Sequence, residues 1–319
     1  MKLPGLGGMA IDWREGTETE LEIAPALMNL AYSLDCGQAF RWRPSDEGWW
    51  IGVVRGHALR LRREGSRVIG QCFPPMADVD RFLAGYLRLD VDLDAIYRRI
   101  SNADPWIASA VSAFSGLRVL DQEPEETLLS FVCSAANSVP RISRSMAEIS
   151  RRYGELIGYV DGEGLFTFPK ATSLADASVD VLSRECGLGW RGSSLRGVAR
   201  ELVDRPAGWL DRLRLQTYEE AKARLMGIKG IGAKIADCIC LFSLRKDSAV
   251  PVDTHIWAIA REIFRCEVTT KTLTPATYQT VANLFAKRYG SYAGWAQQYL
   301  YLQRRASQGR VRPLSDATS

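Results

Sequence analysis

The part of the chain most suggestive of chemistry is a glycine-rich turn that suits anion binding. Gly227, Gly230 and Gly232 would end one helix and let the backbone turn tightly into the next. Ile228 and Ile231 would hold this turn in the core. In such a helix-hairpin-helix, backbone N–H groups point outward and can bind a DNA phosphate without reading sequence. An ordinary glycine turn between packed helices is the alternative.

A lysine and an aspartate follow the turn. Lys234 lies two residues after Gly232, and Asp253 follows nineteen residues later. Pro251 stiffens the approach to Asp253, which is placed to cap a helix beginning at Thr254. A cap position would keep the carboxylate ionised. Taken alone, the pair is also explained as a solvated lysine and a helix cap without a catalytic role.

Histidine and cysteine usage excludes several other chemistries. The chain has two histidines, His57 and His255, which rules out a His-rich metal centre and leaves a Ser-His-Asp hydrolase only these two candidates. Its seven cysteines are an odd number without CxxC pairs, which argues against a disulfide scaffold and against Cys-rich zinc sites. We therefore expect reduced thiols.

The hydrophobic pattern divides the chain into a β-rich part and a helical part. Leu59 and Leu61 alternate with arginines, as in a sheet with one wet face. Turn signals separate the predicted strands, which are 49–55, 57–63 and 67–73. From Met76 to about Arg305 the spacing is helical. The pattern predicts an α+β protein in which an antiparallel meander precedes an all-α domain.

Helix-start signals and composition give finer boundaries. The predicted helices include one from Pro124 to near Asn137, one beginning at Thr217, and the segments 233–244 and 254–264. The predicted domains are 1–105, a sheet domain with flanking helices, 106–305, a helical domain, and 306–319, a disordered basic tail. The arginines near this end, Arg305, Arg310 and Arg312, are expected to be solvated, with a minor role in phosphate contact.

Overall composition is that of a folded protein. Of 319 residues, 46% are hydrophobic and 24% charged, and Lys+Arg exceeds Asp+Glu by 41 − 37 = 4. These values exclude collagen-like, low-complexity and wholly disordered classes. No run approaches the roughly 20 apolar residues of a membrane span, so we expect a soluble intracellular protein.

Several segments together resemble the helix-hairpin-helix DNA glycosylase superfamily, and more specifically its eukaryotic-type 8-oxoguanine DNA glycosylase/lyase family. The superfamily pattern is such a hairpin followed by a Gly/Pro-rich loop and an Asp. The matching segments occur in order between about residues 30 and 305, and they are 36–42, 129–134, 187–191, 237–241 and 292–297. The resemblance implies an N-terminal antiparallel sheet domain followed by an all-α helix-hairpin-helix body.

The resemblance assigns the chemistry to Lys234 and Asp253. A lysine at this place is similar to that of the bifunctional enzymes, which form a Schiff base at C1′ and cleave the strand by β-elimination. Only a neutral amine can attack, so Lys234 must be partly desolvated. Asp253 would stabilise the positive charge that develops on the sugar. Lys229 occupies a place where the family usually has Pro and is interpreted as a solvated or phosphate-side charge.

The resemblance also implies how a flipped base is recognised. The backbone carbonyl of Gly37 would accept the N7 hydrogen that distinguishes 8-oxoguanine from guanine. Gln297 would read the Watson–Crick edge. Cys238 and Tyr301 would sandwich the ring, where the family has Phe in place of this tyrosine. Phe242 would line the pocket, although Cys238 and Phe242 are four residues apart and are also explained as core.

The residues expected to contact DNA are Asn137, Arg141, Trp190, Arg191, Gly230, Gly232 and His255. Trp190 matches a wedge tyrosine, and Arg141 and Arg191 match arginines that engage the orphaned cytosine. His255 would meet a phosphate, with a satisfied core histidine as the alternative. Two departures stand out. The family fills the vacated gap with an Asn where this chain has Ala136, and it usually has an Asp where this chain has Arg304.

The partner implied is double-stranded DNA containing 8-oxoguanine opposite cytosine. The protein is expected to be a DNA-associated monomer of the nucleus or nucleoid that needs no cofactor or metal for its chemistry, although the hairpin carbonyls leave room for a structural monovalent cation. A helix-hairpin-helix glycosylase for another damaged base and a non-catalytic DNA-binding module are the alternatives. Only Cys266 follows Asp253, which counts against relatives with an iron–sulfur cluster. A binding module would not need Lys234 and Asp253 in register.

Overall fold

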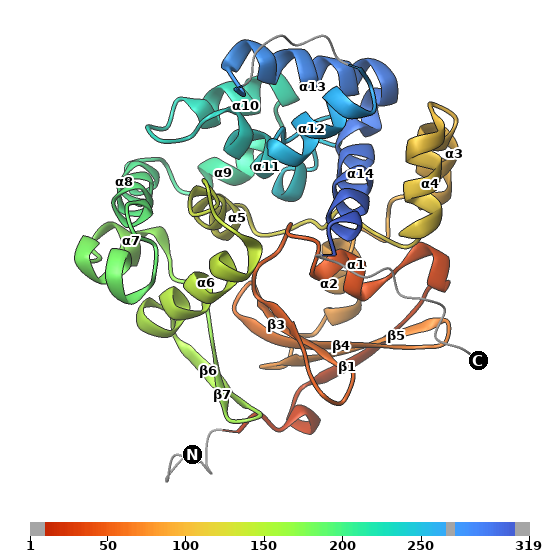
Figure 1. The fold of residues 1–319 in the computed structure, drawn as a ribbon. Coiled ribbons are helices and arrows are strands. Elements are labelled where there is room, and N and C mark those ends of the chain that lie inside the picture. The colour runs from red at the N-terminus through yellow and green to blue at the C-terminus, as the bar shows by residue number, and fades with distance from the viewer. Residues whose placement is uncertain (1–9, 266–271, 310–319) are drawn as a thin grey trace.

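The computed structural model describes residues 10–265 and 272–309, which form a five-stranded antiparallel sheet and a helical body (Figure 1). The sheet has the order β1-β5-β4-β3-β2. Its strands are β1 Thr17–Glu22, β2 Trp42–Pro44, β3 Trp50–Val54, β4 His57–Glu64 and β5 Arg67–Phe73. The predicted antiparallel meander, and with it the α+β class, is confirmed.

The alternation in β4 positions the sheet against a helix. Leu59 and Leu61 are fully buried and share a core cluster with Leu83 of α2 (Val79–Tyr86). The intervening Arg60 lies on the opposite face, with its guanidinium 4.3 Å from the centroid of the Trp49 ring. The predicted two-faced strand is confirmed, and its outer face is partly covered by cation–π contact.

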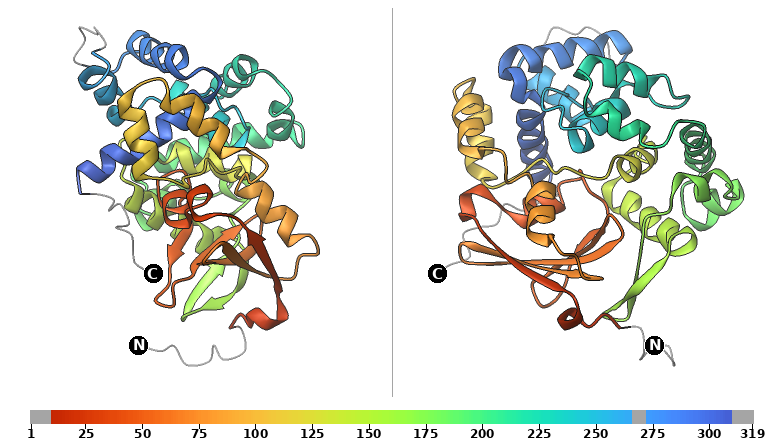
Figure 2. Two further views of the ribbon diagram at one scale, coloured as in Figure 1. Left: turned by 90° about the vertical axis from the view of Figure 1, so that its right-hand side faces the viewer. Right: turned by 180° about the vertical axis from the view of Figure 1, so that it is seen from behind.

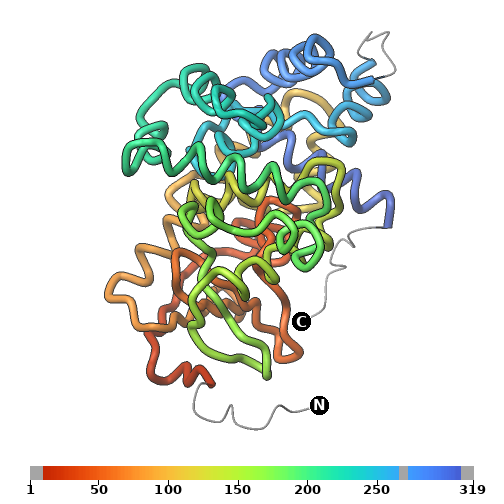
Figure 3. The backbone as a smooth tube through the Cα atoms, turned by 90° about the vertical axis from the view of Figure 1, so that its left-hand side faces the viewer, coloured from red at the N-terminus to blue at the C-terminus, as the bar shows by residue number. Residues whose placement is uncertain are grey.

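The helical body follows α2 along the chain. Its helices are α3 Leu93–Ser101, α4 Pro105–Ala113, α5 Pro124–Val132, α6 Val139–Tyr153, α7 Ala171–Ala175, α8 Arg191–Val203, α9 Trp209–Leu213, α10 Tyr218–Met226, α11 Ala233–Ser243, α12 Thr254–Glu262, α13 Pro275–Tyr289 and α14 Ala293–Ser307. Short turns of 3₁₀ or π helix lie at Trp13–Glu15, Pro25–Leu27, Val181–Glu185 and Gly290–Tyr292. Figures 2 and 3 show the sheet at one end of the molecule and α13 at the other.

Two N-terminal segments belong to the core of the helical body. Leu93, Ile96 and Ile100 of α3 are buried in the helical core cluster rather than in the cluster under the sheet. The segment after α1 (Leu30–Leu34) does the same, because Cys36 and Phe40 are buried against the helices. This segment therefore places Gly37 at the junction of sheet and helices.

The helical domain differs from the all-α expectation in containing a hairpin. Strands β6 (Leu156–Val160) and β7 (Glu163–Phe166) pair in an antiparallel ribbon. The turn between them is Asp161-Gly162, and both residues have positive φ, +55° and +79°. Asp-Gly between β-rich runs is a strong hairpin signal, so the sequence contained evidence for this ribbon.

One predicted helix end is wrong. The helix beginning at Pro124 ends at Val132 rather than near Asn137, because Arg191 binds the carbonyls of Ala135 and Ala136 in the loop that follows. At the other end of the chain, α14 continues to Ser307, and Arg305 is only 9% exposed rather than solvated. Arg310, Arg312 and Cys266 lie outside the described residues.

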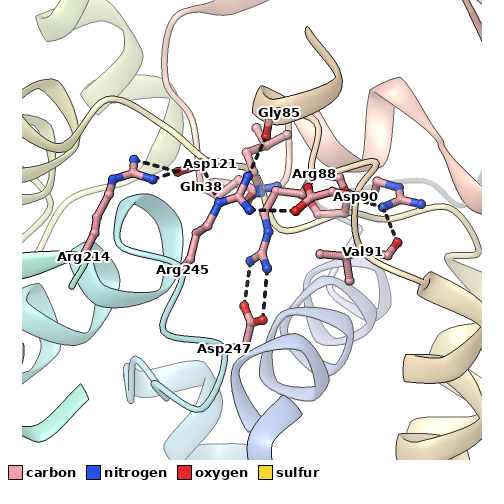
Figure 4. Close-up of polar contacts among 11 residues, drawn as sticks. Gln38, Gly85, Arg88, Asp90, Val91, Asp121, Arg214, Arg245 and Asp247 are labelled. Atoms are coloured by element: carbon pink, nitrogen blue, oxygen red, sulfur yellow. Dashed lines mark hydrogen bonds and ion pairs between the residues drawn. The ribbon is translucent and has the colours of Figure 1, made fainter. Parts of the chain in front are cut away.

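An ion-pair network joins the end of α2 to the helical body (Figure 4). Arg88 is 3% exposed and binds both carboxylate oxygens of Asp247, at 2.6 and 3.0 Å. Asp121 accepts hydrogen bonds from Arg214 at 3.0 Å and from Arg245 at 2.8 Å. Burial favours a higher pKa for Asp121, but the two guanidinium groups bring it below its ordinary value.

We expect Asp121→Asn to lower the free energy of unfolding by about 3 kcal/mol, because it leaves two guanidinium groups without their shared carboxylate. Urea denaturation measures the change. Asp12→Asn removes the carboxylate of the exposed Asp12–Arg14 pair and should change nothing measurable.

The effect of Asp121→Asn should also depend on pH. Because the pKa of Asp121 is lower in the folded state, its contribution is present above the unfolded value near ~4 and is lost as the pH falls through the folded value. The difference between wild type and Asp121→Asn should therefore shrink at acid pH. A difference independent of pH down to acid unfolding would show that the charge is not the cause.

Candidate active site

A cavity of about 770 Å³ lies where the α5–α6 loop, α11, α12 and α14 meet the segment after α1. Its volume is within the range of small-ligand sites. The cavity brings together six of the residues predicted from sequence, which are Gly37, Asn137, Lys234, Asp253, His255 and Tyr301. They come from segments far apart in the chain, so the fold assembles the site.

The hairpin forms as predicted. α10 begins with a capping box in which Thr217 and Glu220 bond each other's backbone N–H. In the turn, Gly230 has φ +98°, and Gly232 is the N-cap of α11. Ile228 is buried beneath the turn. This places the N-terminus of α11 outward and Lys234 in its first turn.

Lys234 is half-buried and points into the cavity. Its Nζ donates to Oγ of Ser134 at 2.9 Å and lies 5.3 Å from the centroid of the Phe131 ring. Burial raises the pKa of the neighbouring Cys238 thiol to about 12 despite the lysine charge, so the thiol stays neutral. Lys229 is exposed. The sequence did not identify Ser134 as the residue that holds the amine.

Asp253 is the N-cap of α12, as predicted. Its side chain accepts from the backbone N–H of Ile256 at 2.9 Å. The preceding loop is held by Tyr278, whose hydroxyl accepts from the N–H of Val252 at 3.3 Å and donates to buried Asp237. Helix dipole and loop anchoring together hold an acceptor-only group in the cavity wall.

Gly37 and the residues of α14 form the opposite wall. Gly37 has φ +89°, a backbone conformation in which a residue with a side chain would be strained. A Cβ there would also lie 3.1 Å from Val139. The ring of Tyr301 makes an edge contact with His255 at a centroid distance of 5.5 Å. Tyr301 is partly buried, and burial raises the pKa of its hydroxyl, which stays protonated.

The α14 residues of interest share one face of that helix. Gln297, Tyr301 and Arg305 are spaced by four residues, the spacing of one helix face. Gln297 is buried, and its Oε1 accepts no hydrogen bond within the described part of the chain. Arg305 lines the cavity, and its buried Nη1 has no hydrogen-bond partner among the described residues. The i+4 spacing could have identified Arg305 from sequence.

Several predicted residues lie outside the cavity lining. Cys238 and Phe242 are buried, and the Phe242 ring stacks on Phe131 at 5.6 Å. Gln297, Gly230 and Gly232 do not line it either. Phe242 thus contacts the lining residue Phe131 but packs in the hydrophobic core, as the alternative prediction for this helix face expected.

The loop expected to fill the DNA gap is held in part by a side chain of α8. Arg191 donates to the carbonyls of Ala135 and Ala136 at 2.5 and 2.7 Å, and its guanidinium lies 4.7 Å from the ring centroid of Trp190. Trp190 is 60% exposed. Asn137 donates to the carbonyl of Cys133 at 3.1 Å. Arg141 is exposed on α6. The predicted DNA-contact residues of this loop region therefore gather on one rim.

Two features of other protein classes are absent from residues 10–265 and 272–309. No group of three or more His, Cys, Asp or Glu side chains could hold a metal ion there. No helix in that range is long and apolar enough to cross a membrane.

Comparison with known proteins agrees with this architecture. Residues 129–284 match the family model of the HhH-GPD superfamily of base excision DNA repair proteins, so the chain is a DNA repair enzyme of the helix-hairpin-helix class. Residues 20–128 match the N-terminal domain of 8-oxoguanine DNA glycosylase. The chain belongs to the 8-oxoguanine DNA glycosylase family, and the resemblance read from sequence is confirmed.

Individual relatives extend over most of the chain. It is 33% identical to the N-glycosylase/DNA lyase OGG1 of Arabidopsis thaliana, over 88% of this chain and 79% of that protein. The structure of MBOgg1 in complex with a low-affinity DNA ligand superposes with a TM-score of 0.81 at 27% identity, covering 92% of this chain and 97% of that one. A Clostridium acetobutylicum 8-oxoguanine glycosylase/lyase, bound to DNA with cytosine opposite 8-oxoG, gives 0.78 at 27% identity, covering 89% and 93%.

Proposed function

We propose that this enzyme flips 8-oxoguanine out of duplex DNA, excises it through a Schiff base on Lys234, and then cleaves the strand by β-elimination. The observation that carries the proposal is the cavity in which Lys234 and Asp253 face Gly37 and Tyr301. The relatives' activities on 8-oxoguanine DNA support the choice of base.

The chemistry needs only groups present in the cavity. Nζ of Lys234 attacks C1′, the bond from C1′ to the base breaks, and the base leaves with the electron pair and takes up a proton. One proton of the attached amine passes to the ring oxygen O4′ as the C1′–O4′ bond breaks, which leaves the protonated imine of C1′. Loss of a C2′ proton then expels the 3′ phosphate. Asp253 stabilises the positive charge on the sugar in the first step.

Recognition of the base follows from the walls of the site. The Gly37 carbonyl accepts the N7 hydrogen. The unpaired, buried Oε1 of Gln297 accepts an N–H of the Watson–Crick edge, which would satisfy an atom that is costly to leave unpaired. The ring of Tyr301 packs against one face of the base with its hydroxyl toward Gly37 at the base edge, and Cys238 lies on the other face.

DNA is held outside the cavity by the remaining predicted residues. The N–H groups at Gly230 and Gly232 and the side chain of His255 bind phosphates, and Trp190 wedges into the stack. Arg141 and Arg191 engage the orphaned cytosine. We propose that the protein does this as a monomer, in the nucleus or nucleoid of its cell.

Base release from duplexes that differ only in the damaged base tests the proposal. The wild type should release 8-oxoguanine opposite cytosine far faster than 3-methyladenine, or adenine opposite guanine. Efficient release of an alkylated base with no release of 8-oxoguanine would favour the alternative glycosylase. Binding without release of any base would favour the DNA-binding module.

Ala136 makes a separate prediction about the opposite base. Its φ of +47° suits Asn better than Ala, and an Asn there can fill the gap and bond the orphaned cytosine. We expect Ala136→Asn to sharpen preference for cytosine by about tenfold or more. Asn137→Ala should change it little, because Asn137 bonds its own loop. Excision rates opposite C, T, G and A measure this, and loss of preference in Asn137→Ala would assign the gap to Asn137 instead.

A further inference from the structure

A small space beside Gly37 is surrounded by two hydrogen-bond donors. At the point where a Cβ would stand on Gly37, the nearest atoms are a methyl of Val139 at 3.1 Å, the hydroxyl of Tyr301 at 3.5 Å and Nη1 of Arg305 at 3.6 Å. All four residues line the cavity. The missing side chain therefore leaves the cavity wall recessed beside Gly37, and we call this recess, which is bounded by Val139, Tyr301 and Arg305, the notch.

Arg305 is unusual in being buried without full pairing. It is 9% exposed, and its Nη1 is buried with no partner among the described residues. A buried guanidinium N–H without an acceptor is costly, and such groups normally have a partner. Burial raises the pKa of Asp35, and the charge of Arg305 partly offsets that rise. This interaction is electrostatic and leaves Nη1 of Arg305 without a hydrogen-bond acceptor in the described part of the chain. The notch is where an acceptor could enter.

We propose that Arg305 and Tyr301 form a donor pair that binds a carbonyl oxygen of the flipped base in the notch beside Gly37. This inference rests on the proposed function, since the Gly37 carbonyl is expected to meet N7–H. In 8-oxoguanine the carbonyl oxygen O8 is on C8, which is bonded to N7, and O6 is on C6, one atom beyond C5, so both oxygens lie on the same edge of the base as N7–H. An oxygen in the notch accepts from a cationic N–H and from a phenol O–H. The chain thus recognises the acceptor next to N7–H as well as the hydrogen itself.

The neighbouring arginine provides a matched control. Arg304 precedes Arg305 on α14 and pairs with Glu262 at 2.8 Å, outside the cavity lining. Arg304→Met and Arg305→Met remove the same charge from the same helix, so a general loss of attraction to DNA affects both. Tyr301→Phe removes only the hydroxyl and keeps the ring.

Single-turnover excision of 8-oxoguanine opposite cytosine should fall about 10- to 100-fold in Arg305→Met relative to Arg304→Met, the range for one charge-assisted hydrogen bond. Tyr301→Phe should lower it by about 2- to 10-fold, as for a neutral bond. Borohydride trapping on a duplex with a preformed abasic site needs no base contact, so Arg305→Met and Arg304→Met should trap equally there.

Equal excision of 8-oxoguanine by Arg305→Met and Arg304→Met, with an active wild type, would overturn the donor pair and leave the proposed function standing. So would a parallel loss of abasic-site trapping in Arg305→Met, since that indicates damage to the fold. A wild type that traps abasic DNA but releases no 8-oxoguanine would contradict the proposed function and the inference with it.

Binding assigns the oxygen. In a Lys234→Gln background, which prevents turnover, duplexes with 8-oxoguanine and with 8-oxoadenine are compared. If Arg305→Met weakens binding of both, the notch holds O8, and if it weakens only 8-oxoguanine, it holds O6. Unchanged binding of both would contradict the donor pair.

Discussion

Replacing Lys234 with glutamine is expected to abolish borohydride trapping on a duplex containing 8-oxoguanine, while binding of that duplex persists. Glutamine is close in size and can donate to Ser134 as the lysine does at 2.9 Å, but its amide nitrogen cannot form an imine. A denaturing gel of the borohydride-treated complex measures the adduct. Since the substitution removes the nucleophile, the loss should be complete rather than fractional.

Lys229→Gln is the matched control for this experiment. Lys229 is exposed and lies five residues earlier, in the hairpin turn. Its replacement should leave trapping essentially intact and weaken affinity for any duplex slightly, through one lost charge. Adducts that persist in Lys234→Gln and vanish in Lys229→Gln would show that the turn lysine is the nucleophile.

Asp253→Asn is expected to lower the single-turnover excision rate by several orders of magnitude, with duplex binding retained. An amide can cap α12 in place of the carboxylate, which accepts from Ile256 at 2.9 Å, but it cannot stabilise a developing cation. A modest loss of stability should accompany the change, because the interaction with the helix dipole weakens. Thermal unfolding and excision kinetics on the same preparations separate the two effects.

Asp253→Ser completes the test, because serine caps helices well and carries no charge. If Asp253 acts on the sugar, both variants should be slow although both remain folded. Turnover that falls only in proportion to the folded fraction in either variant would show that Asp253 serves the helix alone.

The strongest patterns predicted the fold because each depends on local physics. The alternation of leucines and arginines around Leu59 and Leu61 can bury only one face of a strand. The glycines of the 227–232 turn allow the tight connection between two helices. Where the sequence was misread, the cause was tertiary. α5 ends early because Arg191, nearly sixty residues later, binds the carbonyls of its following loop.

The site was predicted in part for the same reason. Spacing and resemblance identified Lys234 and Asp253, and the structure places both in one cavity. Ser134 and Arg305 were missed. A serine after a helix has no local pattern that distinguishes it from a solvated residue, whereas Arg305 continues the i+4 spacing of Gln297 and Tyr301, a signal that was present in the sequence.

The two walls proposed to face the base come from distant parts of the chain, and this has a consequence for biosynthesis. Gly37 precedes the α10–α11 hairpin in the chain and α14 follows it, and the contact between Gln298 and Cys36 spans 262 residues. The α10–α11 hairpin, by contrast, closes over a few residues. Because local contacts form before distant ones, a nascent chain acquires the hairpin that we propose to bind phosphate well before it acquires the wall that we propose to distinguish bases. On this proposal, discrimination between bases is gained after phosphate binding as the protein is made.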